Sequence, residues 1–234
     1  MNKRFQFKQF SLAQDQCAMK IGTDGILLGA WTDIPTHIHN VLDVGAGTGL
    51  LSCMIAQRHN SAHIDAIEID AGGYQQCRDN IKESPYSERI HVIKDDFRAH
   101  DFLHRYDLIV SNPPFYNGGV YDDSSRKRAR SNDSLPLDSF LKQCDFILNE
   151  DGRISVILPF SEKEHYLSTA KNHDLFPNKI TYVRGTPTSE VKRCLISLSR
   201  NELTIEEDEL IIEHSRHDYT DEFIELTKAF YLNM

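Results

Sequence analysis

Three glycines follow a short apolar run in the segment VLDVGAGTG, residues 41–49. Gly45, Gly47 and Gly49 have the spacing G-x-G-x-G, and a helix-like segment begins directly after them. Glycines at the end of a buried strand allow a tight turn into a helix and a close approach of the backbone to a ligand. The spacing differs from the G-x-G-x-x-G of dinucleotide sites, and the G-K-[ST] of a phosphate-binding loop is absent. The segment predicts a nucleotide-like ligand, and the alternative is a tight turn that binds nothing.

Acidic residues after the next two apolar runs indicate which nucleotide-like ligand this is. Glu68 lies in IDAIEID, about 20 residues beyond the glycines, where a carboxylate can accept hydrogen bonds from both ribose hydroxyls. Asp95, Asp96 and Phe97 follow the third run. One of these two carboxylates can accept from an adenine amino group while the phenyl ring packs on the base. The pattern fits an adenosine ligand but does not decide which of the two aspartates contacts the adenine. The alternative for both aspartates is that they are solvated acids in a loop.

A stiff polar turn, Asn112-Pro113-Pro114-Phe115, follows the apolar run YDLIVS. The prolines fix the backbone of this turn. The side-chain oxygen of Asn112 and the backbone carbonyl of Pro113 can each accept one hydrogen of an amino group. Phe115 can stack on a planar ring beside them. The turn therefore predicts a planar substrate that carries an amine, and the alternative is an ordinary proline-rich turn.

The elements that position these residues alternate between short apolar runs and helix-like segments from residue 41 onward. The predicted strands are 41–45, 63–69, 89–95, 106–111, 153–159, 179–185 and 191–200, and the predicted helices are 48–58, 71–83, 137–148 and 161–173. This alternation predicts an α/β fold with a mostly parallel, seven-stranded sheet and helices on both faces. The last two strands form a hairpin that places an antiparallel strand near the C-terminus. The tail adds an acidic strand at 203–213 and an amphipathic helix at 221–232.

The composition is that of a folded, soluble domain: 234 residues with a net charge of −9, 40% hydrophobic and 26% charged. No stretch approaches the roughly 18 apolar residues of a membrane span, and no apolar segment of a secretory signal follows the basic N-terminus. The 5 cysteines include no C-x-x-C pair, which argues against a disulfide framework and a zinc site. These observations predict a cytoplasmic protein that contains no metal and does not reside in a membrane.

Positive charge is concentrated in one short run and negative charge in the C-terminal tail. Arg126, Lys127, Arg128 and Arg130 place four cations in five residues, soon after the amine-binding turn. Residues 201–234 carry ten acidic and two basic residues, so the rest of the chain is almost neutral. A negative total normally counts against a nucleic-acid partner, but a local basic run can still grip phosphates. The alternative is a solvated basic loop.

These motifs together resemble the class I S-adenosylmethionine-dependent methyltransferases that methylate amino groups conjugated to a π-system. Three further features are similar to the bacterial tRNA1(Val) adenine-37 methyltransferases. They are KIGTDGILLGAW at residues 20–31, the basic run after NPPF, and the ending YTDEFIELTKAFYL. This similarity extends over essentially the whole chain.

The resemblance implies a Rossmann-like methyltransferase domain over residues 1–234. Residues 1–40 would cover the site, 41–200 would form the core, and 201–234 the acidic strand and helix. The implied donor is S-adenosyl-L-methionine, the implied product a methylated exocyclic amine of adenine, and the implied partner tRNA. Nothing in the sequence requires more than a monomer.

The resemblance also gives individual residues a role. Asn112 and Pro113 would favour the pyramidal, attacking form of the amine and aim its lone pair at the methyl group. Asp43 would lie near the methionine end of the donor, or serve as a structural acid bonded to the loop amides. Thr23 and Asp24 would cover the donor from the other side, and a helix N-cap is the alternative for both.

Other functions remain as alternatives. A protein glutamine methyltransferase would also suit NPPF, because a side-chain amide is a conjugated amine, but it has no need of four clustered cations. A DNA adenine methyltransferase would be expected to carry a separate target-recognition domain, and none is apparent in these 234 residues. A non-catalytic adenosine-ligand module that binds RNA or a partner protein would not need an amine-activating turn. A nicotinamide dehydrogenase fits the glycine spacing poorly.

Overall fold

The computed structural model describes residues 4–17, 19–113 and 135–234. The strands of its large sheet are β3 (Asn40–Val44), β4 (His63–Glu68), β5 (Ile90–Lys94), β6 (Tyr106–Ser111), β7 (Leu148–Pro159), β8 (Phe176–Arg184), β9 (Val191–Ser199) and β10 (Glu206–Ile211). Two small hairpins are β1 (Phe5–Gln6) with β2 (Ser11–Leu12) and β11 (Glu213–Ser215) with β12 (Asp218–Tyr219). The helices are α1 (Thr23–Trp31), α2 (Leu50–Arg58), α3 (Ala71–Glu83), α5 (Leu137–Ile147), α6 (Lys163–Lys171) and α7 (Asp221–Thr227), with a 3-10 turn at Phe160–Glu162.

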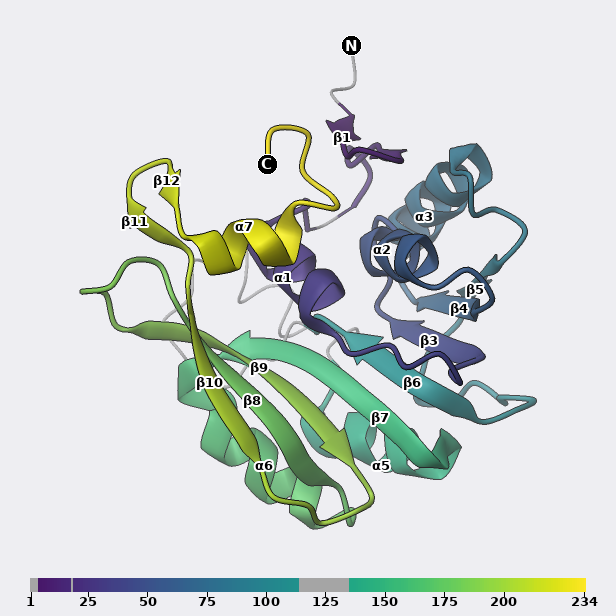
Figure 1. Cartoon of the computed structure of the whole chain (residues 1–234). Helices are drawn as coiled ribbons and strands as arrows, with labels where there is room; N and C mark the ends of the chain where they lie inside the picture. The colour runs from purple at the N-terminus through teal and green to yellow at the C-terminus, as the bar shows by residue number, and fades with distance from the viewer. Residues whose placement is uncertain (1–3, 18, 114–134) are drawn as a thin grey trace, which may run out of the picture.

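The sheet confirms the predicted fold class and corrects the number of strands. Its order is β10-β8-β9-β7-β6-β3-β4-β5, so eight described strands replace the predicted seven (Figure 1). Only β9 is antiparallel to its neighbours β7 and β8. The extra strand is the acidic segment of the tail, which pairs in parallel with β8 over Glu206–Ile211. The tail therefore extends the sheet.

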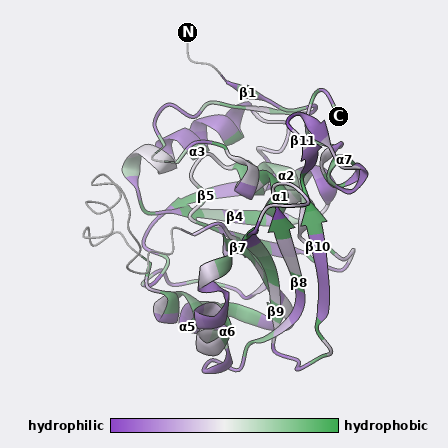
Figure 2. Ribbon diagram, turned by 90° about the vertical axis from the view of Figure 1, so that its left-hand side faces the viewer, coloured by the Kyte–Doolittle hydropathy of each residue, from purple (hydrophilic) through white to green (hydrophobic). Residues whose placement is uncertain are grey.

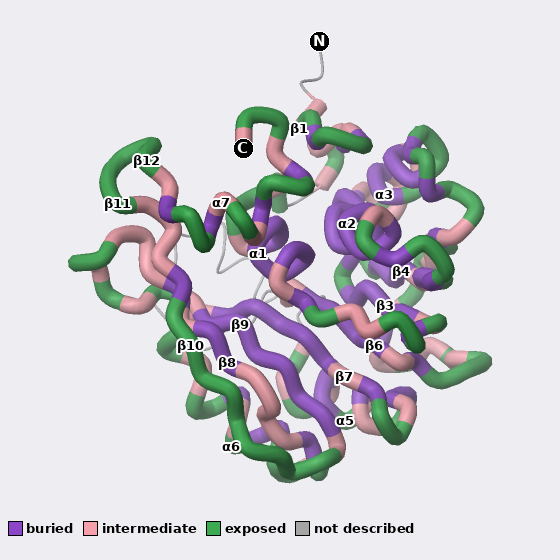
Figure 3. Tube along the Cα trace, in the orientation of Figure 1, coloured by how far each residue is buried: buried purple, intermediate pink, exposed green. Residues whose placement is uncertain are grey.

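Helices cover both faces of the sheet, and each face has its own apolar core. Helices α1, α2, α3 and α7 pack on one face, around residues such as Leu28, Met54 and Phe223. Helices α5 and α6 pack on the other, around Phe140 and Tyr166. The middle strands are buried, whereas β10 is exposed at the edge (Figure 3). Among the helices of the described ranges, none is long and apolar enough to cross a membrane.

The two chain ends pack together over α1 and α2 (Figure 1). The predicted C-terminal helix is shorter than expected, because α7 ends at Thr227 and the chain turns. This turn buries Phe230 and brings its carbonyl to the backbone N–H of Lys8, at 2.9 Å. The Lys8 ammonium donates to the carbonyls of Lys228, at 2.6 Å, and Met234, at 2.7 Å.

The carboxyl ends of β3, β4, β5 and β6 share one edge of the sheet, because these strands are parallel. In open α/β sheets this edge is where ligands bind. The glycine turn, Glu68, the Asp95-Asp96 pair and Asn112 each follow or end one of these strands. The fold therefore brings the residues singled out in the sequence to one side of the molecule.

Candidate functional site

The glycine turn connects β3 to α2 with a left-handed backbone at all three glycines, φ 73° at Gly45, 53° at Gly47 and 80° at Gly49. The N–H groups of Gly45 and Ala46 donate to the carbonyl of Ile67 in β4, which fixes the turn to the sheet. The two outer glycines differ in their surroundings. A Cβ added at Gly45 would meet nothing within 4 Å, whereas one at Gly49 would lie 3.0 Å from Ile81. Gly45 therefore faces open space, and Gly49 packs against α3.

A pocket of about 360 Å³ lies over this turn. It is lined by the end of the N-terminal segment and the start of α1, by the glycine turn and the start of α2, and by Asn112. The lining residues are Met19, Lys20, Ile21, Gly22, Thr23, Asp24, Gly25, Gly45, Ala46, Gly47, Thr48, Leu50, Leu51 and Asn112. The predicted ligand turn and the predicted amine-binding residue therefore share one pocket.

Glu68 ends β4 and does not itself line the pocket, but its carboxylate bonds to the backbone of Gly47, which does. One carboxylate oxygen accepts from the Gly47 N–H and the other from the Asp70 N–H, both at 2.9 Å. Burial raises the pKa of Glu68, and backbone hydrogen bonds from Asp70, Gly47 and Ile69 oppose the rise. A carboxylate offers about four acceptor sites, so capacity remains to accept from a ribose hydroxyl. Asp70 is the N-cap of α3, where its side chain accepts from the Gly73 N–H at 2.7 Å.

Asp43 is buried beneath the turn and does not line the pocket. Its Oδ2 accepts from the backbone N–H of Ser52, at 3.0 Å, and from the Ser52 hydroxyl, at 2.7 Å. Among the described residues, Oδ1 has no hydrogen-bond partner. Burial raises the pKa of Asp43 to about 6, against the lowering effect of the bonds from Ser52. The carboxylate joins β3 to α2 through Ser52. It does not bond to the backbone amides of the glycine turn, contrary to what the structural alternative from the sequence had expected.

The aspartates after β5 are already engaged with basic side chains. A hydrogen bond from His100 lowers the pKa of Asp95, and the two side chains lie 2.8 Å apart. Asp96 accepts from Nε and Nη2 of Arg98, which lowers the pKa of Asp96. Phe97 is buried on the α5 side of the sheet. None of the three lines the pocket, so the choice between the two aspartates stays open.

Asn112 and Pro113 follow β6 and are half-buried. The preceding Ser111 is fully buried and donates its hydroxyl to the Val44 carbonyl at 2.8 Å, which ties the end of β6 to β3. Phe115 and the basic residues Arg126, Lys127, Arg128 and Arg130 lie outside the described residues. Within the described ranges, no group of three or more His, Cys, Asp or Glu side chains is arranged to hold a metal ion.

The structure places the start of α1 at the pocket and adds three polar residues that the sequence patterns did not single out, Arg193, Gln76 and Asn80. Gly22, and not Thr23 or Asp24, is the N-cap of α1. Asp24 lines the pocket and accepts a hydrogen bond, at 2.8 Å, from the guanidinium of Arg193 in β9.

On α3, the buried amides of Gln76 and Asn80 bond to the N-terminal segment. Their four-residue spacing on one helix face was the available signal, but the same spacing is common on solvated helix surfaces.

The sequence model of the methyltransferase small domain family matches residues 21–166. A tRNA1(Val) (adenine(37)-N6)-methyltransferase of Flavobacterium psychrophilum is 49% identical over 234 residues, covering 98% of this chain and all of that protein. A protein of the same name from Aliivibrio fischeri is 45% identical over 235 residues, covering the full length of both.

Solved structures share the fold. A predicted O-methyltransferase of Agrobacterium tumefaciens has a TM-score of 0.68 at 19% identity and covers 88% of this chain and 96% of its own. A glycopeptide N-methyltransferase solved with (S)-adenosyl-L-methionine has a TM-score of 0.58 at 13% identity and covers 78% of this chain and 89% of its own.

Proposed function

The chain belongs to the family of tRNA1(Val) (adenine(37)-N6)-methyltransferases, and we propose that it carries out the reaction that gives this family its name. This membership confirms the resemblance identified from the sequence motifs. The methyl donor is S-adenosyl-L-methionine, and the acceptor is the exocyclic amine of adenine 37 in tRNA1(Val). The observation that carries the proposal is the single pocket shared by the glycine turn and Asn112.

The residues around the pocket fit an adenosine-bearing donor. Gly45 leaves open space where a side chain would project, and Glu68 is held by two backbone N–H groups at the pocket border. On this proposal Glu68 holds the ribose, and Asp95 or Asp96 accepts from the adenine amine beside Phe97. Asp43 and the turn lie at the methionine end. When bound, the donor supplies an electrophilic methyl group on a sulfonium sulfur.

Asn112 and Pro113 act on the acceptor amine. The lone pair of an adenine amine is delocalised into the ring, so the neutral amine is a poor nucleophile. The Asn112 oxygen and the Pro113 carbonyl each accept one N–H, which holds the nitrogen pyramidal and directs its lone pair toward the methyl group. Positive charge would develop on the nitrogen as the N–C bond forms and the donor's methyl C–S bond breaks, with S-adenosylhomocysteine as the leaving group, and the same two oxygens would stabilise that charge. The nitrogen then loses one proton to solvent, and Phe115 supports the base by stacking.

Asn112→Ala tests this assignment. Its bonds are made to the substrate amine, so turnover at saturating tRNA should fall by about 100-fold or more, while affinity for S-adenosylhomocysteine stays nearly intact. The measurement is transfer of labelled methyl groups to separate pools of tRNA, DNA and protein. Label in the protein pool alone would contradict the proposed substrate, and near-normal turnover of the variant would contradict the role of Asn112.

The basic run Arg126, Lys127, Arg128 and Arg130 is proposed to hold tRNA phosphates while the target base leaves its stack. Replacing all four with Ser should raise the KM for tRNA and reduce the slope of log affinity against log salt by about 3, since each lost phosphate contact removes about 0.7–0.9. Substitution of the exposed Lys142 and Lys171 on α5 and α6 is the control. Equal affinities and slopes for the variant and the wild type would place the RNA elsewhere.

A further inference from the structure

The segment between β2 and α1 forms one wall of the pocket. We define this strap as residues 13–17 and 19–22. Its last four residues, Met19 to Gly22, line the pocket opposite the glycine turn. Met19 is 51% exposed and Lys20 is also exposed, and of these four residues Ile21 packs against the apolar core. Polar contacts along the rest of the strap also contribute to its position.

Those contacts come from one face of α3. Gln76, Asn80 and Glu83 follow one another at intervals of four and three residues, which places them in a row along the helix. The helix is largely hydrophilic in Figure 2, yet Gln76 and Asn80 are only 2% and 1% exposed. The N-terminal segment covers them. This face of α3 is a docking surface for the segment and not a solvated surface.

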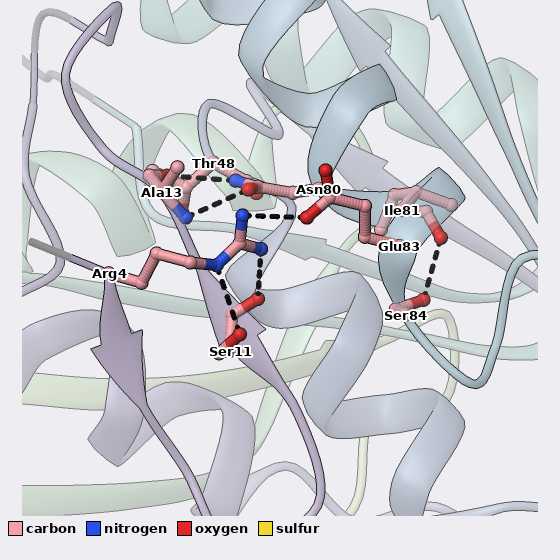
Figure 4. Close-up of polar contacts among 8 residues, drawn as sticks. All are labelled: Arg4, Ser11, Ala13, Thr48, Asn80, Ile81, Glu83 and Ser84. Atoms are coloured by element: carbon pink, nitrogen blue, oxygen red, sulfur yellow. Dashed lines mark hydrogen bonds and ion pairs between the residues drawn. The ribbon is translucent and has the colours of Figure 1, made fainter. Parts of the chain in front are cut away.

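Asn80 uses its whole amide group in this docking (Figure 4). Its side-chain oxygen accepts from the Ala13 N–H at 2.8 Å, and its amide donates to the Ala13 carbonyl at 2.8 Å. The same amide donates to the carbonyl of Thr48, in the glycine turn, at 2.9 Å. One buried side chain thus bonds both to the strap and to the opposite wall of the pocket.

The other polar contacts of this face of α3 reach the strap or the β1–β2 hairpin before it, but they do not reach the glycine turn. Gln76 accepts from the Gln16 N–H at 2.9 Å. The Gln16 carbonyl passes so close to α3 that a Cβ added at Gly72 would lie 2.8 Å from it. Arg4 joins Glu83, at 2.6 Å, to the β1–β2 hairpin through two hydrogen bonds to Ser11 (Figure 4).

We propose that Asn80 is a positioning residue for the methyl donor: it fixes the strap relative to the glycine turn and so holds the two walls of the pocket at the separation that the donor requires. The inference rests on the proposed function in taking this pocket as the donor site. None of the Asn80 bonds reaches Asn112, so its effect falls on donor affinity and not on the chemical step.

Asn80→Ala should raise the Kd for S-adenosylhomocysteine, measured by calorimetry, by about ten-fold, because buried groups on both walls lose their partners. Hydrogen exchange in peptides that cover the strap should become faster in the same variant. Turnover at saturating donor should stay within about two-fold of wild type, so that the change appears in the KM for the donor. Asn80→Asp keeps the acceptor for Ala13 but faces two carbonyl oxygens with a carboxylate, and should weaken binding at least as much.

Gln76→Ala and Gln75→Ala are the matched variants on the same helix. Gln76→Ala releases the strap alone and should give faster exchange with a smaller loss of affinity. Gln75 bonds only to Asp79 among the described residues, and Gln75→Ala should change neither quantity. A folded Asn80→Ala protein with wild-type exchange and wild-type Kd would overturn the proposal. If that variant does not fold, unchanged exchange and Kd in Gln76→Ala would overturn it instead. Failure of the wild type to bind S-adenosylhomocysteine would contradict the proposed function, whereas the exchange rates test the strap contacts independently.

Discussion

At the scale of single residues, Asp43 combines complete burial with incomplete hydrogen bonding. Ser52 satisfies one of its oxygens, and the other has no partner among the described residues. Since burial disfavours the charged form, the folded protein raises the pKa of this carboxyl from 3.8 to about 6. A proton bound at Asp43 therefore favours the folded state.

The consequence is a stability contribution that decreases with rising pH. It is complete below the unfolded-state pKa of 3.8 and is lost as the pH rises through about 6. Asp43→Asn removes this titration while keeping an acceptor for Ser52. The unfolding free energy of the wild type minus that of Asp43→Asn should fall by up to about 3 kcal/mol between pH 4 and pH 7. Urea unfolding of both proteins across this range is the measurement, and parallel pH profiles would contradict the expectation.

The strand-end residues of the candidate site were predictable because parallel strands bring their carboxyl ends to one edge. Glu68 and Asn112 follow from that rule together with the turn chemistry around them. Asn80 and Arg193 do not, since their partners Ala13 and Asp24 are 67 and 169 residues away in the sequence. No local pattern distinguishes an amide that docks a distant segment from one that faces water.

At the scale of elements, the glycines of the turn from β3 to α2 differ in role: Gly49 serves the packing of the fold, and Gly45 faces the pocket. Gly45 and Gly49 both have positive φ, but only Gly49 packs against α3, where an added Cβ would lie 3.0 Å from Ile81 and 3.1 Å from Cys77. Gly49→Ala should lower the unfolding free energy by about 2–4 kcal/mol, combining backbone strain with overpacking.

Gly45→Ala carries the backbone strain alone, at about 1 kcal/mol, and points its methyl group into open space at the pocket. It should therefore lose affinity for S-adenosylhomocysteine more than it loses stability. Denaturant unfolding and calorimetry on both variants give the two quantities. Equal destabilisation by the two substitutions would contradict this division of the turn.

The apolar runs and the helix periodicity predicted most elements of the sheet and its helices to within a few residues. The β1–β2 and β11–β12 hairpins were not predicted, because strands of two or three residues carry no measurable alternation. The acidic strand was expected, but not its place beside β8. That pairing depends on the three-dimensional position of the tail and not on its own sequence.

At the scale of the whole molecule, the two chain ends stabilise each other. Phe230 is 1% exposed, and its carbonyl accepts from Lys8 in the N-terminal segment. Phe230→Ala should lower the unfolding free energy by about 3–5 kcal/mol, as for other buried phenylalanines. Leu232→Ala is the nearby control, because Leu232 is 55% exposed and its loss should cost less than about 0.5 kcal/mol. Chemical denaturation of both variants is the measurement, and similar values for the two would show that the chain ends contribute little to stability.

Strand β10 is an edge strand of the sheet, and a strand of another molecule could pair with it. Its first four residues, Glu206 to Glu209, are all exposed, and no described strand pairs with its outer side. Exposed edge strands are templates for pairing with a strand of another molecule, and charged side chains along them oppose this pairing. A second copy approaching β10 through its own β10 would bring two rows of carboxylates together. The acidic tail thus bears on colloidal behaviour, because its carboxylates oppose the joining of two molecules through this edge.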